Sequence, residues 1–427
     1  MEDFEQNQDF EYIKERMKER PVNKKRLIRR MVITASMAVV FGVLACFTFL
    51  VLEPVFSNFL YPEEEPQAVE IPEDTDEMLP EDMMIVEEDS TVKPEETTNK
   101  DDEVLSDYKL LYQKIYELAN KTMKSMVTVT GVSQDIDWFN NSYENKGQTS
   151  GLIVANTGRE ILILADEKIL DKAEDLHVTF SDGTTAVASV KQTDANTEQV
   201  VIAVPVNQIG KSTLNVIDVA SLGNSKSTSL LATPVIALGR PYGNTKSVAY
   251  GMITSKGTVL NLIDCNYELL TTDIYGSEEA NGILLNLNGE VIGIINQKYN
   301  KDEAKNLISA VGISELKRTI ERMSNGKEMA YLGINGTDVT GEANTSLGVP
   351  LGAYVTGIVM DSPAMKAGIQ SGDVITKINE QEILSFSQYA AAIAECRPEE
   401  TITVTLMRQG PEEYREITLS IPLEKLK

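Results

Sequence analysis

The sequence predicts a mainly β fold, built as closed barrels or a sandwich, with a smaller α+β unit after it and one transmembrane helix before it. Three observations lead to this prediction. Short apolar runs with a period of two lie between residues 126 and 287, separated by Gly, Asn and Asp. A helical segment followed by two strand-like segments closes the chain after residue 385. Residues 31–52 carry no charged side chain.

The first 52 residues have the pattern of a membrane anchor. Residues 14–30 carry nine basic and two acidic side chains, and the 22 uncharged residues 31–52 follow. A helix of that length is about 33 Å long, enough to cross a bilayer core of about 30 Å. Basic residues stay in the cytoplasm, so we expect a cytoplasmic tail over 1–30 and a single-pass cell-membrane protein with its C-terminal domains outside. A cleaved signal peptide fits less well because no A-x-A site closes the run, and a lipoprotein signal at Cys46 fits less well because apolar residues follow it.

Residues 53–105 are predicted to be an acidic, disordered linker. Between residues 61 and 106 the chain has 18 acidic residues, two lysines and five prolines, a net charge of −16. Such a segment buries too little apolar area to offset its chain entropy, and no DxDxDG spacing indicates a calcium loop. The whole chain has 65 acidic and 39 basic residues, a balance that argues against nucleic-acid binding.

Composition excludes several other kinds of site. His177 is the one histidine, so a His-rich metal site cannot be built. Cys46, Cys265 and Cys396 lie far apart and form no CxxC pair. We therefore expect no metal site, no cofactor and no disulfide framework.

The ordered exterior divides into two predicted domains. Apolar residues at helical spacing from Tyr108 to Ala119 predict an amphipathic helix, and the short strands follow it. A second helix is predicted over 314–323, with Ser314 as its N-cap. The first domain then covers 106–325 and the second 328–427.

Several stretches of this exterior resemble known families. SPAMKAGIQSGDVITKIN (362–379) resembles the core of a PDZ domain, and YLGI (331–334) resembles the carboxylate-binding loop of PDZ domains that follow HtrA-type serine proteases. NLNGEVIGII (286–295) and SLGNSKSTSLLATPVIALGRPYG (221–243) resemble the protease part of the same HtrA (DegP-like) family. The resemblance covers about 108–425 and implies a trypsin-like double β-barrel followed by a PDZ domain (α+β).

The resemblance also assigns a peptide-binding role to Tyr331, Leu332, Gly333 and Ile334. Successive backbone N–H groups of such a loop point at the terminal carboxylate of a peptide, and the next strand pairs with the peptide. The expected partners are exposed C-termini or strands of other proteins. Because family members are often trimers, a homotrimer or a mixed oligomer with an active relative is implied as well.

The catalytic triad of that family is degenerate in this chain. The family serine lies in G-N-S-G-G, and the matching stretch here is EEANG, which puts Ala280 in the place of the serine. Asp166 is assigned to the position of the histidine and Glu198 to that of the aspartate. Glu278 and Glu279 replace the Gly-Asn of the oxyanion turn, where their carboxylates would repel a developing oxyanion. We therefore assign no catalytic residue.

These observations predict a pseudoprotease: a membrane-tethered, extracytoplasmic HtrA-like homologue that binds exposed C-termini in envelope protein quality control or as a scaffold. One alternative is an active HtrA-like serine endopeptidase with a non-standard site. His177, Asp194 and Ser277 follow the trypsin-like order, but His177 falls on a strand after the family position, and no spacing supports a Ser–Lys pair. The other alternative is a PDZ-based assembly or sensor protein.

Overall fold

The computed structural model describes residues 31–44 except 34 and 38, then 68–72, 100–136, 142–171, 173–244, 246–300 and 304–426. Residues Pro66–Lys427 form one unit, and Met1–Glu65 form another that is described by itself. The described residues between 31 and 44 are helical. Within the described part of the chain, no helix has both the length and the apolarity to cross a bilayer. The predicted tail 1–30 and the last part of the predicted span, 45–52, lie outside the described residues.

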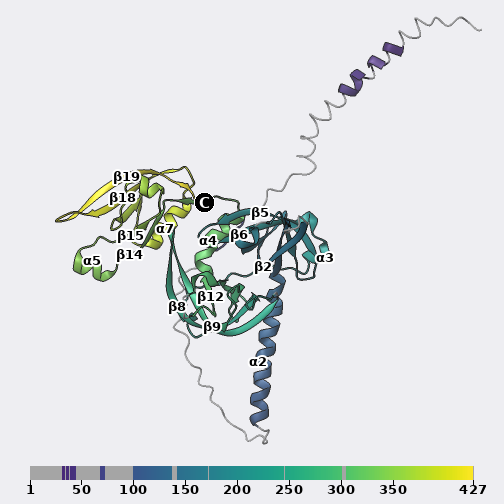
Figure 1. Ribbon diagram of the computed structural model, residues 1–427, viewed down its shortest axis with the longest axis horizontal. Coiled ribbons are helices and arrows are strands. Elements are labelled where there is room, and N and C mark those ends of the chain that lie inside the picture. The colour runs from purple at the N-terminus through teal and green to yellow at the C-terminus, as the bar shows by residue number, and fades with distance from the viewer. Residues whose placement is uncertain are drawn as a thin grey trace, which may run out of the picture. The chain divides into compact units, whose positions relative to one another are not determined.

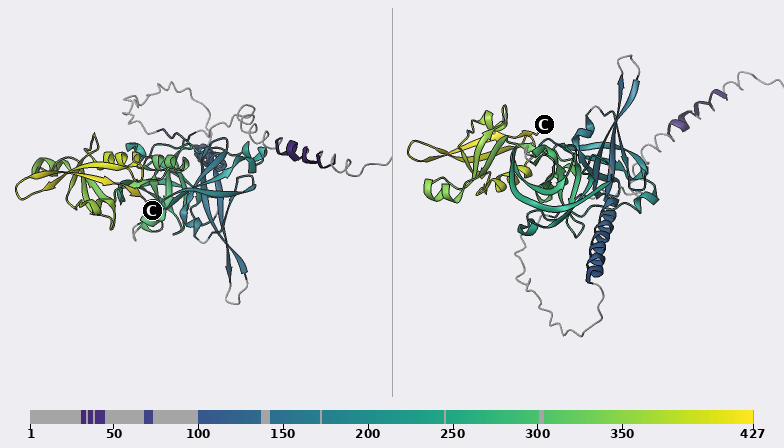
Figure 2. Two further views of the ribbon diagram at one scale, coloured as in Figure 1. Left: turned by 90° about the horizontal axis from the view of Figure 1, so that it is seen from above. Right: turned by 60° about the horizontal axis from the view of Figure 1, so that its bottom comes forward.

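The first barrel is closed by antiparallel strands in the order β1-β2-β3-β6-β5-β4. Its strands are β1 (Met126–Ile136), β2 (Ser142–Asn156), β3 (Glu160–Asp166), β4 (Asp175–Thr179), β5 (Thr185–Asp194) and β6 (Gln199–Pro205). Figure 2 shows β1 and β2 continuing beyond the barrel as a long hairpin.

Strand β3 shows why some strands of this barrel are apolar on both faces. Ile161 and Ile163 point into the core of the first barrel, whereas Leu162 and Leu164 belong to a cluster shared with the second barrel. Successive side chains of a strand point to opposite faces, so burial of both faces requires a continuous apolar run. Strand β6 alternates between the same two cores.

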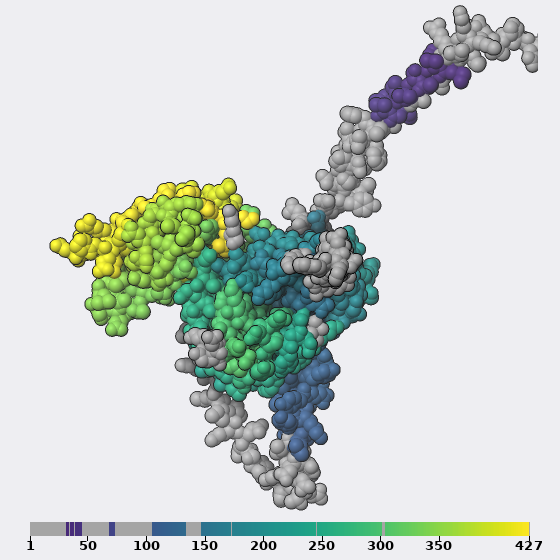
Figure 3. Space-filling model, viewed as in Figure 1, coloured from purple at the N-terminus to yellow at the C-terminus, as the bar shows by residue number. Residues whose placement is uncertain are grey.

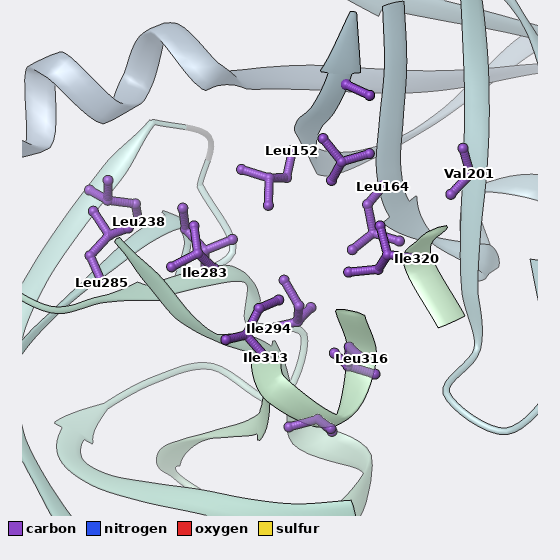
Figure 4. Close-up of a cluster of buried hydrophobic side chains, with 14 of the residues drawn as sticks. Leu152, Leu164, Val201, Leu238, Ile283, Leu285, Ile294, Ile313, Leu316 and Ile320 are labelled. Carbon is purple, nitrogen blue, oxygen red and sulfur yellow. The ribbon is translucent and has the colours of Figure 1, made fainter. Parts of the chain in front are cut away.

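The second barrel repeats this plan in the order β10-β11-β12-β9-β8-β7. Its strands are β7 (Pro234–Arg240), β8 (Ser247–Leu262), β9 (Cys265–Tyr275), β10 (Asn281–Leu285), β11 (Val291–Asn296) and β12 (Leu307–Gly312). Figure 4 shows the cluster between the barrels, where Leu152 and Leu164 of the first barrel meet Ile283 and Ile294 of the second and Leu316 of helix α4 (Ile313–Ser324). Burial of this shared apolar surface holds the barrels together.

The C-terminal domain is an antiparallel sheet with helices packed on it, drawn in green to yellow in Figure 1. The sheet order is β14-β15-β16-β18-β19, with β17 paired to β16, and β13 pairs with β20. Its strands are β13 (Ala330–Tyr331), β14 (Ile334–Asp338), β15 (Ala353–Ile358), β16 (Val374–Ile378), β17 (Gln381–Glu382), β18 (Thr401–Gln409), β19 (Tyr414–Pro422) and β20 (Glu424–Lys425). The helices are α5 (Gly341–Leu347), α6 (Pro363–Ala367) and α7 (Phe386–Glu395).

Helix α2 (Lys100–Thr122) begins six residues before the predicted start of the ordered exterior. Ile115 and Ala119 are buried in the shared core, while Tyr108 and Tyr116 are exposed. Figure 3 shows the first part of the helix, in blue, standing clear of the barrels. The apolar spacing in the sequence marks the turns that pack on the core. It could not show that the helix continues beyond them, so the helix of the structure begins within the predicted linker 53–105.

Residues 68–72 are ordered against helix α4, although the sequence predicts a disordered linker there. The backbone N–H of Val69 donates to Oδ1 of Asn325 at 3.1 Å, and the carbonyl of Val69 accepts from Nδ2 of the same side chain at 3.0 Å. The N–H of Ile71 donates to Glu321 at 3.4 Å, and Val69 and Ile71 pack on the shared core. The high charge of the surrounding sequence hid this short apolar alternation.

The predicted N-cap of α4 was also wrong, because Gly312 takes that position. The hydroxyl of Ser314 accepts the N–H of Ser225 at 2.8 Å, and the hydroxyl of Ser225 accepts the N–H of Ser314 at 3.0 Å. This reciprocal pair ties the segment before β7 to the first turn of α4. The short helical turns elsewhere are η1 (Met123–Ser125), η2 (Glu167–Leu170), η3 (Val206–Gln208), α3 (Lys211–Leu214), η4 (Thr228–Leu230) and η5 (Gln297–Tyr299).

Candidate functional site

Asp166 and Glu198 are brought together at neighbouring strand ends of the first barrel. Asp166 ends β3 and pairs with Gln199 at the start of β6, directly after Glu198. Oδ1 of Asp166 accepts the N–H of Lys168 at 2.9 Å, so this carboxylate caps η2. Burial raises the pKa of Asp166 above its ordinary value, and the nearby Glu198 adds to the increase. The position assigned to the histidine therefore holds a capping carboxylate with no imidazole. The exposed Lys168 follows it two residues later.

Glu198 is bound to the second barrel. Its carboxylate pairs with the ammonium group of Lys298 at the start of η5, and its carbonyl accepts the N–H of Glu167 at 2.8 Å. The backbone of Glu198 has a φ of 55°, which is unusual for a residue other than glycine. Glu198, which the sequence resemblance assigns to the position of the aspartate, thus forms an ion pair between the two barrels.

Ala280 lies in the turn that leads into β10, and only 5% of its surface is exposed. Its N–H donates to the carbonyl of Ser277 at 3.0 Å, and the N–H of Ser277 donates to the carbonyl of Pro241 at 3.0 Å. In a trypsin-like site the N–H of the nucleophile residue helps to bind the oxyanion. Here that donor is used within the turn, and the methyl group beside it cannot attack a carbonyl carbon.

The two glutamates of this turn point outward. Glu278 and Glu279 are exposed, and the carboxylate of Glu278 lies 3.3 Å from the ammonium nitrogen of Lys305. The carboxylate of Glu278 therefore does not fill the turn. Next to it, Oδ1 of Asn281 accepts the N–H of Ser150 from the first barrel at 3.0 Å. The cavity that Asp166 and Asn281 line has a volume of about 20 Å³, which is room for roughly one water molecule.

His177, Asp194 and Ser277 have separate surroundings. His177 is half-exposed on β4, where it pairs with Thr130 of β1 and Val187 of β5. The buried carboxylate of Asp194 accepts hydrogen bonds from the N–H and the hydroxyl of Thr197 at 3.1 and 2.5 Å. The buried hydroxyl of Ser277 finds no hydrogen-bond partner among the described residues. The contacts of these residues do not connect them as a triad.

The loop after β13 holds a carboxylate that belongs to the chain itself. The N–H of Leu332 lies 2.7 Å from Oδ2 of Asp264, and the N–H of Gly333 lies 2.8 Å from Oδ2 and 3.1 Å from Oδ1. The N–H of Ile334 reaches Oδ1 at 3.0 Å, and the hydroxyl of Tyr389 on α7 donates to Oδ1 at 2.6 Å. Three successive N–H groups thus converge on one anion, as in a backbone nest.

Gly333 is required for this loop geometry. Its φ is 93°, and a Cβ at this position would lie 2.2 Å from Cβ of Ser362. Ser362 is fully buried and caps α6 by accepting the N–H of Met365 at 3.2 Å, so it has no room to retreat. Any side chain at position 333 would therefore displace the backbone donors on both sides.

Asp264 was not identified from the sequence. It lies in the turn between β8 and β9 with a φ of 58°, and it is 7% exposed. Burial raises the pKa of its carboxyl group, and the donors of Ile334, Tyr389, Gly333 and Leu332 oppose that increase. A lone aspartate in a turn carries no sequence signal for this role, because the hairpin and the loop meet only in the folded chain.

Within the described ranges, no group of three or more His, Cys, Asp and Glu side chains is placed to hold a metal ion. Cys265 and Cys396 are free thiols. Burial raises the pKa of the Cys396 thiol to about 11, so it stays protonated at neutral pH.

Comparisons with known proteins agree with this architecture. The model of the trypsin-like peptidase domain matches residues 149–294, and that of the PDZ domain matches residues 330–419. The fold is thus that of a trypsin-like peptidase domain followed by a PDZ domain. The chain is similar to serine proteases named DegP-like or HtrA.

Two curated relatives illustrate this similarity. A probable periplasmic serine endoprotease DegP-like from Marinomonas sp. (strain MWYL1) is 27% identical over 277 residues, covering 63% of this chain and 56% of the relative. The serine protease Do-like HtrA of Bacillus subtilis (strain 168) is 24% identical over 298 residues, 65% of each chain. This chain thus spans somewhat more than half the length of the curated relatives it matches.

Solved structures show the same fold. The HtrA-type protease AlgW with decapeptide has a TM-score of 0.51 at 19% identity and covers 73% of this chain and 98% of that one. AlgW with tripeptide has a TM-score of 0.51 at 21% identity, with 73% and 97% covered. At these identities the likeness concerns the fold.

Proposed function

We propose that this chain is a membrane-tethered, extracytoplasmic HtrA-like protein that lacks peptidase activity and binds exposed C-termini of proteins through its PDZ domain. The observation that carries the proposal is the turn at Ala280. Acyl transfer needs a nucleophile, a base and oxyanion donors. The methyl group of Ala280 takes the place of the nucleophile, and the backbone N–H of Ala280 donates to the carbonyl of Ser277. Asp166 caps η2 and Glu198 pairs with Lys298, so neither is arranged as part of a triad.

A fluorophosphonate probe tests the absence of activity in the full-length chain. Such probes label a serine whose hydroxyl is activated by a base. We expect no labelling when the chain is treated beside an active trypsin as the positive control. The alternative endopeptidase has one candidate of interest, Ser277, because its hydroxyl is buried without a partner in the described chain. Labelling that disappears in the Ser277→Ala variant would establish that alternative and refute the proposal.

Tethering rests on the charge pattern of the first 52 residues. The basic residues 14–30 precede the uncharged run 31–52, an order that places the tail in the cytoplasm. The DegP-like relatives are named periplasmic, which agrees with folded domains outside the membrane. The full chain is expected to stay with the membrane after alkaline carbonate extraction, and its PDZ domain is expected to be degraded when protease is added to intact spheroplasts. Release by carbonate would contradict the proposed anchor.

Carboxylate binding rests on the loop 331–334, the segment Tyr331, Leu332, Gly333 and Ile334. Its N–H groups already coordinate a carboxylate, which is the group that ends every unmodified chain. The full chain should therefore bind octapeptides with a free C-terminal carboxylate and not the same peptides as C-terminal amides. Equal binding of acids and amides would favour the remaining alternative, a PDZ domain that recognises internal segments for assembly or sensing. A homotrimer or a mixed oligomer with an active relative also belongs to this proposal, and sedimentation of the full chain measures it.

A further inference from the structure

We propose that the hairpin of β8 and β9 is an internal ligand of the PDZ domain, with the Asp264 carboxylate in the place of a bound peptide's terminal carboxylate. This inference rests on the proposed function, because it concerns the site that is proposed to capture C-termini. It adds that the site is occupied by the chain itself before any partner arrives.

The first argument is the completeness of the carboxylate's coordination. Both oxygens of Asp264 are engaged, and the four donors are the N–H groups of Leu332, Gly333 and Ile334 and the hydroxyl of Tyr389. All four donors are neutral. Buried carboxylates are commonly stabilised by a cationic partner, whereas here the loop supplies the hydrogen bonds that it would offer to a terminal carboxylate.

The second argument is the backbone edge beside the loop. Strand β14 pairs with β15 on one side and ends the sheet on the other. At that free edge the N–H of Asp264 donates to the carbonyl of Ile334 at 2.8 Å, and Nδ2 of Asn266 donates to the carbonyl of Gly336 at 3.0 Å. One backbone bond and one side-chain bond thus join alternate residues of the hairpin to alternate residues of β14, so the hairpin covers the edge to which a peptide would be added.

The third argument is that such an occupant can be exchanged. A terminal carboxylate that enters the loop would replace the bonds of Asp264 with bonds of the same kind, and the released Asp264 would regain its hydration. The other ties between the hairpin and β14 are few: Nδ2 of Asn335 donates to the carbonyl of Leu262 at 3.0 Å and to that of Asn261 at 3.5 Å. A partner with a free C-terminus therefore competes with the hairpin for one site.

Competition between the hairpin and a peptide should change the apparent dissociation constant of the peptide. A peptide can bind only the fraction of molecules in which the hairpin has left the loop, so its apparent dissociation constant is the intrinsic value divided by that fraction. If the hairpin occupies the loop in at least nine molecules out of ten, removing the carboxylate should tighten peptide binding roughly tenfold or more. It should also make the second barrel and the PDZ domain less tightly coupled.

The experiment compares four forms of the full-length chain: wild type, Asp264→Asn, Asp264→Gly and the control Asn261→Ala. Asn keeps the shape but presents an amide nitrogen to the donors, and Gly suits the φ of 58° at this position. The side chain of Asn261 is exposed on the same hairpin, and its contact with Asn335 uses its backbone carbonyl. The probes are fluorescent octapeptides randomised at their last three residues, prepared as free acids and as amides, and fluorescence polarisation reports binding.

We expect both Asp264 variants to bind the free acids at least tenfold more tightly than the wild type and the control, with no gain for the amides. Free acids preferred over amides, but bound equally by all four forms, would overturn the internal ligand and leave the proposed function standing. Acids and amides bound alike by all forms would refute the proposed carboxylate capture itself.

Hydrogen exchange of the backbone amides supplies a readout that needs no peptide. The N–H groups of Leu332, Gly333 and Ile334 should exchange at least tenfold faster in the Asp264 variants, while those of strand β18 should keep their wild-type rate. Unchanged exchange in the loop would show that Asp264 does not occupy it and would overturn the proposal. Faster exchange in β18 would mean that the variants unfold the domain. Asn266→Ala then takes their place, since it removes a hydrogen bond that holds the hairpin to β14 and leaves all four donors of the loop intact. It should give an intermediate gain in affinity.

Discussion

Replacing Gly333 by alanine should destabilise the PDZ domain more than the same change at Gly372. The backbone angles are nearly equal, with φ of 93° at Gly333 and 94° at Gly372. An L-residue in this conformation costs roughly 1–2 kcal/mol at either position. At Gly372 the added Cβ would meet nothing within 4 Å, whereas at Gly333 it would lie 2.2 Å from Cβ of the buried Ser362. Overpacking of this kind adds about 1–3 kcal/mol, so the expected totals are about 2–5 kcal/mol for Gly333→Ala and about 1–2 kcal/mol for Gly372→Ala.

Hydrogen exchange of strand β18 in the full-length chain measures this difference, because β18 is an inner strand of the PDZ sheet and exchanges when the domain opens. Gly333→Ala should lower the free energy of opening by about 1–3 kcal/mol more than Gly372→Ala. It should also abolish the preference for free C-terminal acids, whereas Gly372→Ala should retain it. Equal destabilisation by the two variants would refute the argument that close contact with Ser362 constrains the loop.

Three further predictions concern the rest of the chain. Ala280→Ser should not create peptidase activity in a casein assay, because a serine without a base remains about 10⁶-fold below a complete triad in kcat; measurable turnover would mean that a base lies closer than the structure indicates. Asp373→Ala should lower the free energy of opening of the PDZ domain by roughly 2–4 kcal/mol in hydrogen exchange, since this buried carboxylate holds the guanidinium of Arg408 at 2.7 and 2.8 Å and its removal leaves Arg408 with only the carbonyl of Gly368 and no negative partner; a loss within experimental error would show that the pair is dispensable. Burial raises the pKa of Asp194 in the folded state, so the unfolded chain loses this proton first as the pH rises. The stabilising contribution of the carboxyl group is therefore greatest below about pH 4 and is lost as the pH rises above it. The free energy of unfolding of the wild type minus that of Asp194→Asn should decrease from pH 4 to pH 7 in urea titrations, and an increase would contradict the assigned burial.

The barrels could be predicted from the sequence because each strand has a local pattern of apolar residues. Apolar residues on both faces of β3 and β6 reflect the two cores that these strands separate. The turn residues before β10 could likewise be aligned with a family motif one by one. Where prediction failed, a partner distant in the chain determined the local structure. Asn325 binds the backbone of Val69 in the acidic linker. The hydroxyl of Ser314 accepts the N–H of Ser225 and does not cap helix α4.

The candidate site shows the same division. The assignment of Ala280 to the serine position rests on the sequence alone, because residue types in a motif can be compared without a structure. The role of Asp264 was not readable, since its partners Leu332 and Tyr389 are 68 and 125 residues away in the chain. The ion pair of Glu198 with Lys298 spans 100 residues and was hidden for the same reason. Local sequence indicates which residue types stand at the positions of a motif, and only the folded topology shows which distant groups they contact.

The cleavage of unfolded casein by the purified full-length chain tests the central claim most directly. The account predicts that fragments form no faster than in a sample without the protein, at any pH at which the chain stays folded. Fragments that accumulate in proportion to the amount of chain added, and that vanish when one of its side chains is altered, would contradict it.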